Sequence, residues 1–199
     1  ILTKTIESAQ QKIEGRNFGI RKNVLDYDDV MNKQREMIYG QRNRVLDGED
    51  IKETVRKMIT DTVESGVDTY LTGNVAENWN FDGLRDYFRG WLATDNDFKY
   101  TVDELNKLER DDIANMLIDR AVSICEKKEE EYGSTAMREI ERVMLLRSVD
   151  THWMDHIDAM DELRQGIGLR AYGQHNPVVE YRNEGYDMFS AMTSAIKED

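Results

Sequence analysis

The first 46 residues carry apolar side chains that recur every seven positions. Two series share this spacing, four positions out of phase: Ile6, Ile13, Ile20 and Tyr27, and Val24, Met31, Ile38 and Val45. On an α-helix, two such series merge into one continuous apolar stripe. Proline is absent from residues 2–46, so the pattern predicts one helix of about 65–70 Å at 1.5 Å per residue, with a kink allowed near Gly15 and Gly19. A helix this long exceeds a small domain, and we expect it to be a spine for other elements.

The rest of the sequence also favours helices. Charged residues make up 34% and hydrophobic residues 39% of the 199 residues, which suits long, solvent-washed helices better than one thick core. Pro177 is the only proline, and alternating runs of Val, Ile and Thr are missing, which argues against a sheet-rich fold. We therefore predict an all-α fold.

Turn signals divide the chain into three parts. Asp47-Gly48-Glu49-Asp50 ends the spine, and Gly133-Ser134 marks a second break. The predicted domains are the long helix (1–47), a small helical domain (48–133) and a helical hairpin (134–199), with the scaffold formed by the first and third parts. An aromatic core is expected in the middle domain: Trp79, Phe81, Tyr87, Phe88, Trp91, Phe98 and Tyr100. In the hairpin, Met137, Met144 and Met160 are expected in the core, and Ile140 lies on the same apolar pattern.

The hairpin is predicted to turn in a short loop that holds Gly166, Gly168, Gly173 and Pro177. Leu169, Arg170 and Tyr172 lie at its tip, where no neighbouring element would bury them. An aromatic residue and an arginine on an exposed hairpin are typical of a contact with a partner.

Charge is distributed unevenly. The net charge is −13, and residues 47–133 hold 22 acidic and 11 basic side chains. Neutralising phosphates needs a clustered basic surface, so we expect no nucleic-acid partner. The tip region, with a small positive excess, suits anionic lipid or an acidic partner.

Several features set the expected cellular context. The lone Cys125, expected to be a small buried residue, excludes an internal disulfide and favours a reducing, cytosolic compartment. The sequence contains neither an apolar run of about 18 residues nor a signal-peptide core. It begins with Ile1 in mid-pattern, which predicts a piece of a longer protein.

Catalytic chemistry has one weak candidate. His152 and His156 are four residues apart on a predicted helix, so both rings can face one metal ion. The stretch reads HWMDH rather than HExxH, and it lacks an evident third ligand. A helical metallohydrolase at this pair and a coiled-coil adaptor remain as alternatives. The sequence shows no nucleophilic triad and no phosphate-binding loop.

Two blocks resemble a known family. The first is Ala9–Asn43, AQQKIEGRNFGIRKNVLDYDDVMNKQREMIYGQRN, which is similar to the scaffold helix of the SecA preprotein translocases. The second is Leu145–Met192, LLRSVDTHWMDHIDAMDELRQGIGLRAYGQHNPVVEYRNEGYDMFSAM, which is similar to the two-helix finger of that family. Together they cover about two fifths of the chain. The segment between them fits the helical wing domain in length and position.

The resemblance implies a scaffold, wing and finger region from a bacterial ATPase, in which the finger also restrains ATP hydrolysis. ATP and magnesium would be bound by motor domains outside this chain, so we expect no cofactor and no metal here. The implied partners are the SecYEG channel, an unfolded preprotein, the protein's own motor domains, anionic lipid and a second copy of the protein. The implied location is cytoplasmic, peripheral to the inner face of the cell membrane.

The resemblance also implies roles for single residues. At the finger tip, Leu169, Arg170, Tyr172 and Gln174 would contact the channel or the moving polypeptide, and Arg21 would contact a motor domain. Gly19 departs from the polar, often acidic residue expected in the family at this position, and the family does not typically carry a histidine at the position of His152. The family's cysteine-rich zinc tail is not in this sequence.

Overall fold

The computed structural model describes residues 2–47, 51–170 and 176–199. Regular structure in these ranges is helical, apart from one isolated β-bridge between Arg89 and Ala93. The predicted all-α fold is confirmed. The chain forms two compact units, Ile1–Arg44 with Ser148–Thr193 and Val45–Arg147 with Ser194–Asp199. These limits fall inside helices, whereas the predicted domain limits follow the turns and stay predictions.

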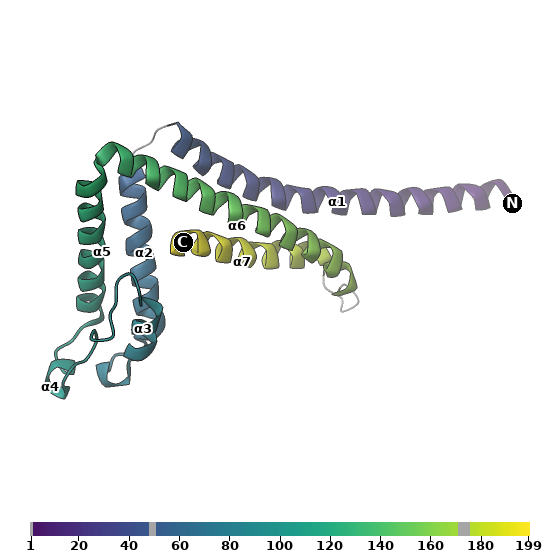
Figure 1. The fold of residues 1–199 in the computed structure, drawn as a ribbon. Coiled ribbons are helices and arrows are strands. Elements are labelled where there is room, and N and C mark those ends of the chain that lie inside the picture. Colours follow the sequence, from purple (N-terminus) through teal and green to yellow (C-terminus); the bar gives the residue numbers. More distant parts are fainter. Residues whose placement is uncertain (1, 48–50, 171–175) are drawn as a thin grey trace. The chain divides into compact units, whose positions relative to one another are not determined.

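The first unit is built on α1, Leu2–Leu46, which is one uninterrupted helix of 45 residues (Figure 1). At 1.5 Å per residue its length is about 68 Å, as the seven-residue pattern predicts. The helix continues through Gly15 and Gly19, and a Cβ added at either position would meet no atom within 4 Å. Neither glycine is therefore required for close packing.

Two helices form the hairpin: α6, Ser134–Arg170, and α7, Pro177–Glu198. They run antiparallel, side by side (Figure 1). In the first unit their buried side chains form a core with partly buried residues of α1 and α7. The buried members are Met160, Leu163, Ile167 and Tyr181, and the partly buried residues packed on them are Tyr27, Val30, Met31 and Met188.

The predicted turn of the hairpin begins too early. Gly166 and Gly168, expected in the loop, lie inside α6, which continues to Arg170. A glycine in a helix costs about 1 kcal/mol relative to alanine, and neighbouring turns can offset that cost. Pro177, also expected in the loop, is the first residue of α7, where its missing N–H and fixed φ are tolerated.

The predicted methionine core of α6 is partly wrong. Met137 and Met160 are buried, but Met144 is 54% exposed and Ile140 is 45% exposed. Met137 and Met144 are seven residues apart and share a helix face. The difference therefore arises because no described element covers that face at Met144.

The second unit contains the small helical domain. Its long helices are α2, Ile51–Tyr70, and α5, Arg110–Tyr132, which pack side by side (Figure 1). Shorter elements lie between them in sequence: η1 (Ala76–Asn78), α3 (Phe81–Tyr87) and α4 (Val102–Leu105). Side-chain caps define two of the starts: Asn80 accepts the Gly83 N–H, and Thr101 and Glu104 form a capping box. At the end of α5, Gly133 adopts a φ of 82°.

An aromatic core fills this domain, as predicted. Phe88 is fully buried, and Trp79 and Phe98 are nearly so, with other aromatic rings packed around them. Trp91 is an exception, because 45% of its surface is exposed. Gly66 on α2 permits the close approach of Phe88, since a Cβ added at Gly66 would lie 2.8 Å from Cζ of Phe88.

Candidate functional site: the long helix and its hairpin

The turn of the hairpin is followed by a helix N-cap at the start of α7. Asn176 precedes α7, and its side-chain oxygen accepts the Val178 N–H at 3.0 Å, as expected of an N-cap. The predicted tip residues Tyr172 and Gln174 lie outside the described residues. Leu169 and Arg170 form the end of α6, and their side chains also lie outside what is described.

Close packing joins the hairpin to α1. The rings of Tyr27 on α1 and Tyr181 on α7 meet edge to face, with centroids 4.8 Å apart, and Tyr181 is only 1% exposed. Gly185 on α7 faces α6, where an added Cβ would lie 2.7 Å from Met160 Cε. The absence of a side chain at Gly185 therefore lets Met160 fill the space between the two helices.

A buried polar contact crosses this apolar seam and joins three helices. Gln34 of α1 donates from Nε2 to the carbonyl oxygen of Gly185 on α7, at 2.9 Å. His156 Nε2 of α6 lies 2.8 Å from Gln34 Oε1. Because the Gly185 carbonyl can only accept, the amide oxygen must face His156, whose Nε2 then carries the proton.

Burial favours the neutral form of this histidine. His156 is 4% exposed and Gln34 is 5% exposed, and desolvation lowers the pKa of His156. The rings of Trp153 and Phe189 lie beside the imidazole, with centroids 5.6 and 5.7 Å away. The site thus holds an uncharged imidazole in aromatic surroundings.

The described residues around His156 do not form a set of metal ligands. Nε2 of His156 is engaged by Gln34. Among the residues that the structure describes, no group of three or more His, Cys, Asp or Glu side chains is placed to hold a metal ion. His156 is instead part of the packing between the hairpin and α1.

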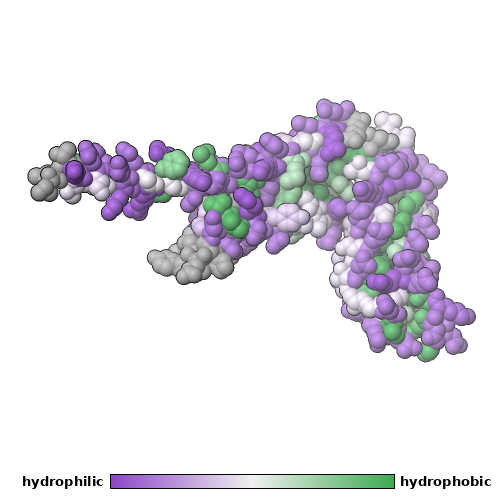
Figure 2. Space-filling view, turned by 180° about the vertical axis from the view of Figure 1, so that it is seen from behind, coloured by the Kyte–Doolittle hydropathy of each residue, from purple (hydrophilic) through white to green (hydrophobic). Residues whose placement is uncertain are grey.

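The other half of α1 presents the same stripe to solvent. Ile6, Ile13, Ile20 and Val24 are between 47% and 60% exposed, whereas Ile38 is 2% exposed. On the face in view, Figure 2 shows this stretch as mainly hydrophilic, with apolar side chains among the charged ones. Arg21, the predicted motor contact, is exposed on this stretch. One stripe therefore has a covered half and an uncovered half.

A groove of about 420 Å³ lies between α1 and α7. Val30, Met37 and Phe189 supply apolar walls, and Asp29 and Arg182 stand among its charged lining residues. The nearby Tyr186 is 71% exposed. The groove is suited to holding an apolar side chain and carries no arrangement of catalytic groups.

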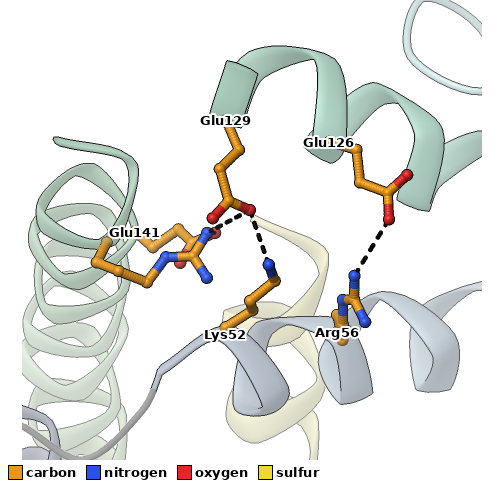
Figure 3. Close-up of polar contacts among 6 residues, drawn as sticks. Lys52, Arg56, Glu126, Glu129 and Glu141 are labelled. Atoms are coloured by element: carbon orange, nitrogen blue, oxygen red, sulfur yellow. Dashed lines mark hydrogen bonds and ion pairs between the residues drawn. The ribbon is translucent and has the colours of Figure 1, made fainter. Parts of the chain in front are cut away.

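The second unit has an ionic cluster, shown in Figure 3, where the ends of three helices meet. Lys52 of α2 contacts Glu129 of α5 at 2.9 Å, and Arg138 of α6 contacts the same carboxylate at 3.4 Å. Arg138 also reaches Glu141 at 3.0 Å. The hydrogen bond from Lys52 is the main reason that the pKa of Glu129 is lowered. The Arg138–Glu141 spacing of three residues is visible in the sequence, but the contacts to Glu129 depend on the fold.

A second charged pair stabilises the small domain. Arg120 donates to both carboxylate oxygens of Asp97, at 2.9 and 3.0 Å, and Thr94 donates to Asp97 from its backbone and its hydroxyl. These hydrogen bonds, Arg120 first, hold the pKa of Asp97 well below its usual range. Sequence reasoning did not identify this pair. Asp97 precedes Phe98, a non-glycine residue with a φ of 61°, so the loop is held in an unusual conformation.

Within the described ranges, none of the helices is both long and apolar enough to cross a membrane. Cys125 is half-buried, and this burial raises the pKa of its thiol, which disfavours the reactive thiolate form.

Comparison with known proteins gives a consistent result. A family model described as the SecA Wing and Scaffold domain matches residues 1–199. The chain is 48% identical over 200 residues to a protein translocase subunit SecA of Desulforamulus reducens and 49% identical over 200 residues to one of Finegoldia magna. It is also 48% identical over 199 residues to a protein translocase subunit SecA 1 of Clostridioides difficile. All of this chain is covered in each case, and it spans 23%, 22% and 22% of the length of these relatives. The chain belongs to the SecA family, as its wing and scaffold region.

Proposed function

We propose that this chain is the mechanical part of an ATP-driven protein translocase subunit, which couples movement of motor domains to polypeptide export. The observation that carries the proposal is the divided stripe of α1. Its second half packs on the hairpin, while Ile6, Ile13, Ile20 and Val24 expose apolar surface. Exposed apolar surface in a continuous pattern is typical of an interface.

The exposed half of α1 would dock on the motor domains of the longer protein, with Arg21 as one contact. ATP and magnesium would be bound by those domains, and this chain would supply neither a catalytic group nor a cofactor ligand. A helix that touches a motor domain with one half and a hairpin with the other is suited to passing on movement, because a rigid element can transmit rotation.

The hairpin would act on the polypeptide. Leu169, Arg170, Tyr172 and Gln174 would contact an unfolded preprotein or the SecYEG channel. The subunit would work in the cytoplasm, peripheral to the inner face of the cell membrane, with anionic lipid and a second copy as further partners. Relatives named as protein translocase subunits support this role.

Replacing Tyr172 with alanine in the full-length subunit tests the hairpin's role. We expect slower translocation, because an aromatic grip on the chain is lost, with basal ATP hydrolysis largely intact. Both rates are measured with SecYEG membranes and a radiolabelled preprotein. Normal transport by the Tyr172→Ala variant would show that the tip does not grip the polypeptide.

A double change, Ile13→Asp with Ile20→Asp, tests the docking half of α1. Charges on the stripe should weaken motor contacts and uncouple ATP hydrolysis from transport. Gln11→Asp provides a matched control, because Gln11 is exposed on the opposite side of the same helix. Equal translocation rates in the double variant and the control would contradict the coupling role.

A further inference from the structure

Gln34 interrupts an apolar series in α1. The series Ile6, Ile13, Ile20 and Tyr27 reaches Gln34 as its next member. The companion series contains Val24, Met31 and Ile38. If α1 moved by seven residues along the hairpin, about 10 Å, Ile20 would take the place of Tyr27 and Val24 that of Met31. Of the α1 side chains packed on the buried core of the hairpin, Tyr27 and Met31 would be replaced by apolar residues, and only Val30 would be replaced by a polar one, Asn23. The apolar contacts therefore define the register only weakly by themselves.

The polar contact does distinguish the registers. In the observed register, the amide of Gln34 donates to Gly185 at 2.9 Å and its oxygen lies 2.8 Å from His156 Nε2. After a shift of seven residues, Tyr27 would occupy this position. A phenol has one hydroxyl, whereas the amide directs a donor and an acceptor to two different helices. A buried group that loses its partner is costly, and Gln34 and His156 are both at most 5% exposed.

Other contacts that depend on register are weaker. The Arg42–Asp150 ion pair has side chains that are 31% and 53% exposed, and Arg164 lies 3.9 Å from Asp28 with both side chains about half exposed. Exposed ion pairs contribute little, because water competes for both partners.

We infer that Gln34 and His156 form a register lock, which holds α1 in one of several apolar registers along the hairpin. Because Gln34 binds α6 through His156 and α7 through Gly185, the lock also keeps both hairpin helices in step with α1. A single polar residue in an apolar helical seam is a known means of specifying register. The register lock defines the position of α1 along the hairpin, whereas the apolar stripe stabilises the packing of α1 on the hairpin.

Spin-label distances between α1 and α6 test this inference. Labels replace the exposed residues Glu36 and Asp158 in a chain carrying Cys125→Ser, and pulsed electron paramagnetic resonance measures their separation. The parent chain should give one distance population. Gln34→Leu, which extends the apolar series, should add a second population that corresponds to a slip of about 10 Å along the helix. Met31→Leu, an apolar exchange in the same seam, should keep one population.

Variants of His156 make the test independent of Gln34. His156→Leu should give the same mixture as Gln34→Leu, and His156→Gln, which retains a side-chain donor, should restore one population. If Gln34→Leu fails to fold by circular dichroism, the two His156 variants decide the matter. One unchanged distance in every folded leucine variant would overturn the lock, as would an equal mixture in Met31→Leu.

Discussion

The core of the small helical domain and the seam between α1 and the hairpin are stabilised in different ways. In the domain, Leu71, Leu84, Phe88 and Leu117 are completely buried by helices and loops on several sides. In the seam, one stripe of α1 meets two helices, and a buried polar contact crosses it. A thick apolar core specifies its own packing, whereas a repeating stripe needs a polar residue to define its register.

The largest effect should come from the aromatic core of the small domain. Phe88→Ala removes a fully buried ring and should lower the free energy of unfolding by about 3–5 kcal/mol. Urea denaturation followed by tryptophan fluorescence measures the loss. Trp91→Ala is the control, since Trp91 is 45% exposed and should matter much less. Equal losses would remove the contrast between core and surface in this domain.

A smaller loss is expected in the seam. Met160→Ala empties a site that is 1% exposed, and should cost about 2–4 kcal/mol, because helices around a narrow stripe can partly close the space. Hydrogen exchange should report faster opening of α6 and α7 near Met160, with the small domain still protected. Loss of protection throughout the domain would show that the two regions unfold together.

The Asp97–Arg120 pair should stabilise the small domain and make its stability depend on pH. Asp97→Asn should cost about 1.5–3 kcal/mol at neutral pH, because hydrogen bonds to a charged group are lost. In the parent chain the folded pKa of Asp97 is lowered, so its stabilising effect is present above the unfolded pKa of about 3.9 and is lost as pH falls toward the folded value. Denaturation curves measured across the acid range should show less of this pH dependence in Asp97→Asn. An unchanged pH dependence would exclude Asp97 as its source.

The packing of α1 on the hairpin should become less stable in acid because of His156. Burial lowers the folded pKa of His156, so the unfolded chain binds a proton more readily. His156 should therefore have no effect on the pH dependence of stability above the unfolded pKa of about 6.5, and should destabilise the fold as pH falls below it. Comparing the parent with His156→Gln between pH 7.5 and 5 isolates this contribution. Identical slopes for both proteins would mean that His156 does not titrate in this range.

The smallest effect is expected on the uncovered half of α1. Ile13→Asp should change the stability of the chain by no more than about 0.5 kcal/mol, since Ile13 is 60% exposed. Thermal unfolding of the 199-residue chain measures it, with Gln11→Asp beside it. A large loss would mean that this half of the stripe is covered within the chain itself.

The sequence predicted the helices better than the contacts between them. The seven-residue repeat revealed α1 from Leu2 to Leu46, and the Gly133-Ser134 signal revealed the break after α5, because both signals are local. The end of α6 was missed, since neighbouring structure decides whether a glycine in a helix is tolerated.

The polar contacts between distant residues were not predicted. Gln34 and His156 are 122 residues apart, and pairing them requires the register of α1 against the hairpin. One signal was present, because Gln34 is a polar member of an otherwise apolar series. The ionic cluster at Glu129 and the Asp97–Arg120 pair gave no comparable signal, since charged residues are abundant throughout this chain.

One residue determines how many helices lie between Arg110 and Arg170. Gly133 has a φ of 82° and a ψ of 149°, a backbone conformation that side-chain-bearing residues avoid. The sequences on both sides are helical, with 23 residues in α5 and 37 in α6. A residue that preferred helical torsion angles at this position would favour a single rod on the order of 90 Å long. The chain can change direction here because a single hydrogen atom stands where a methyl group would be.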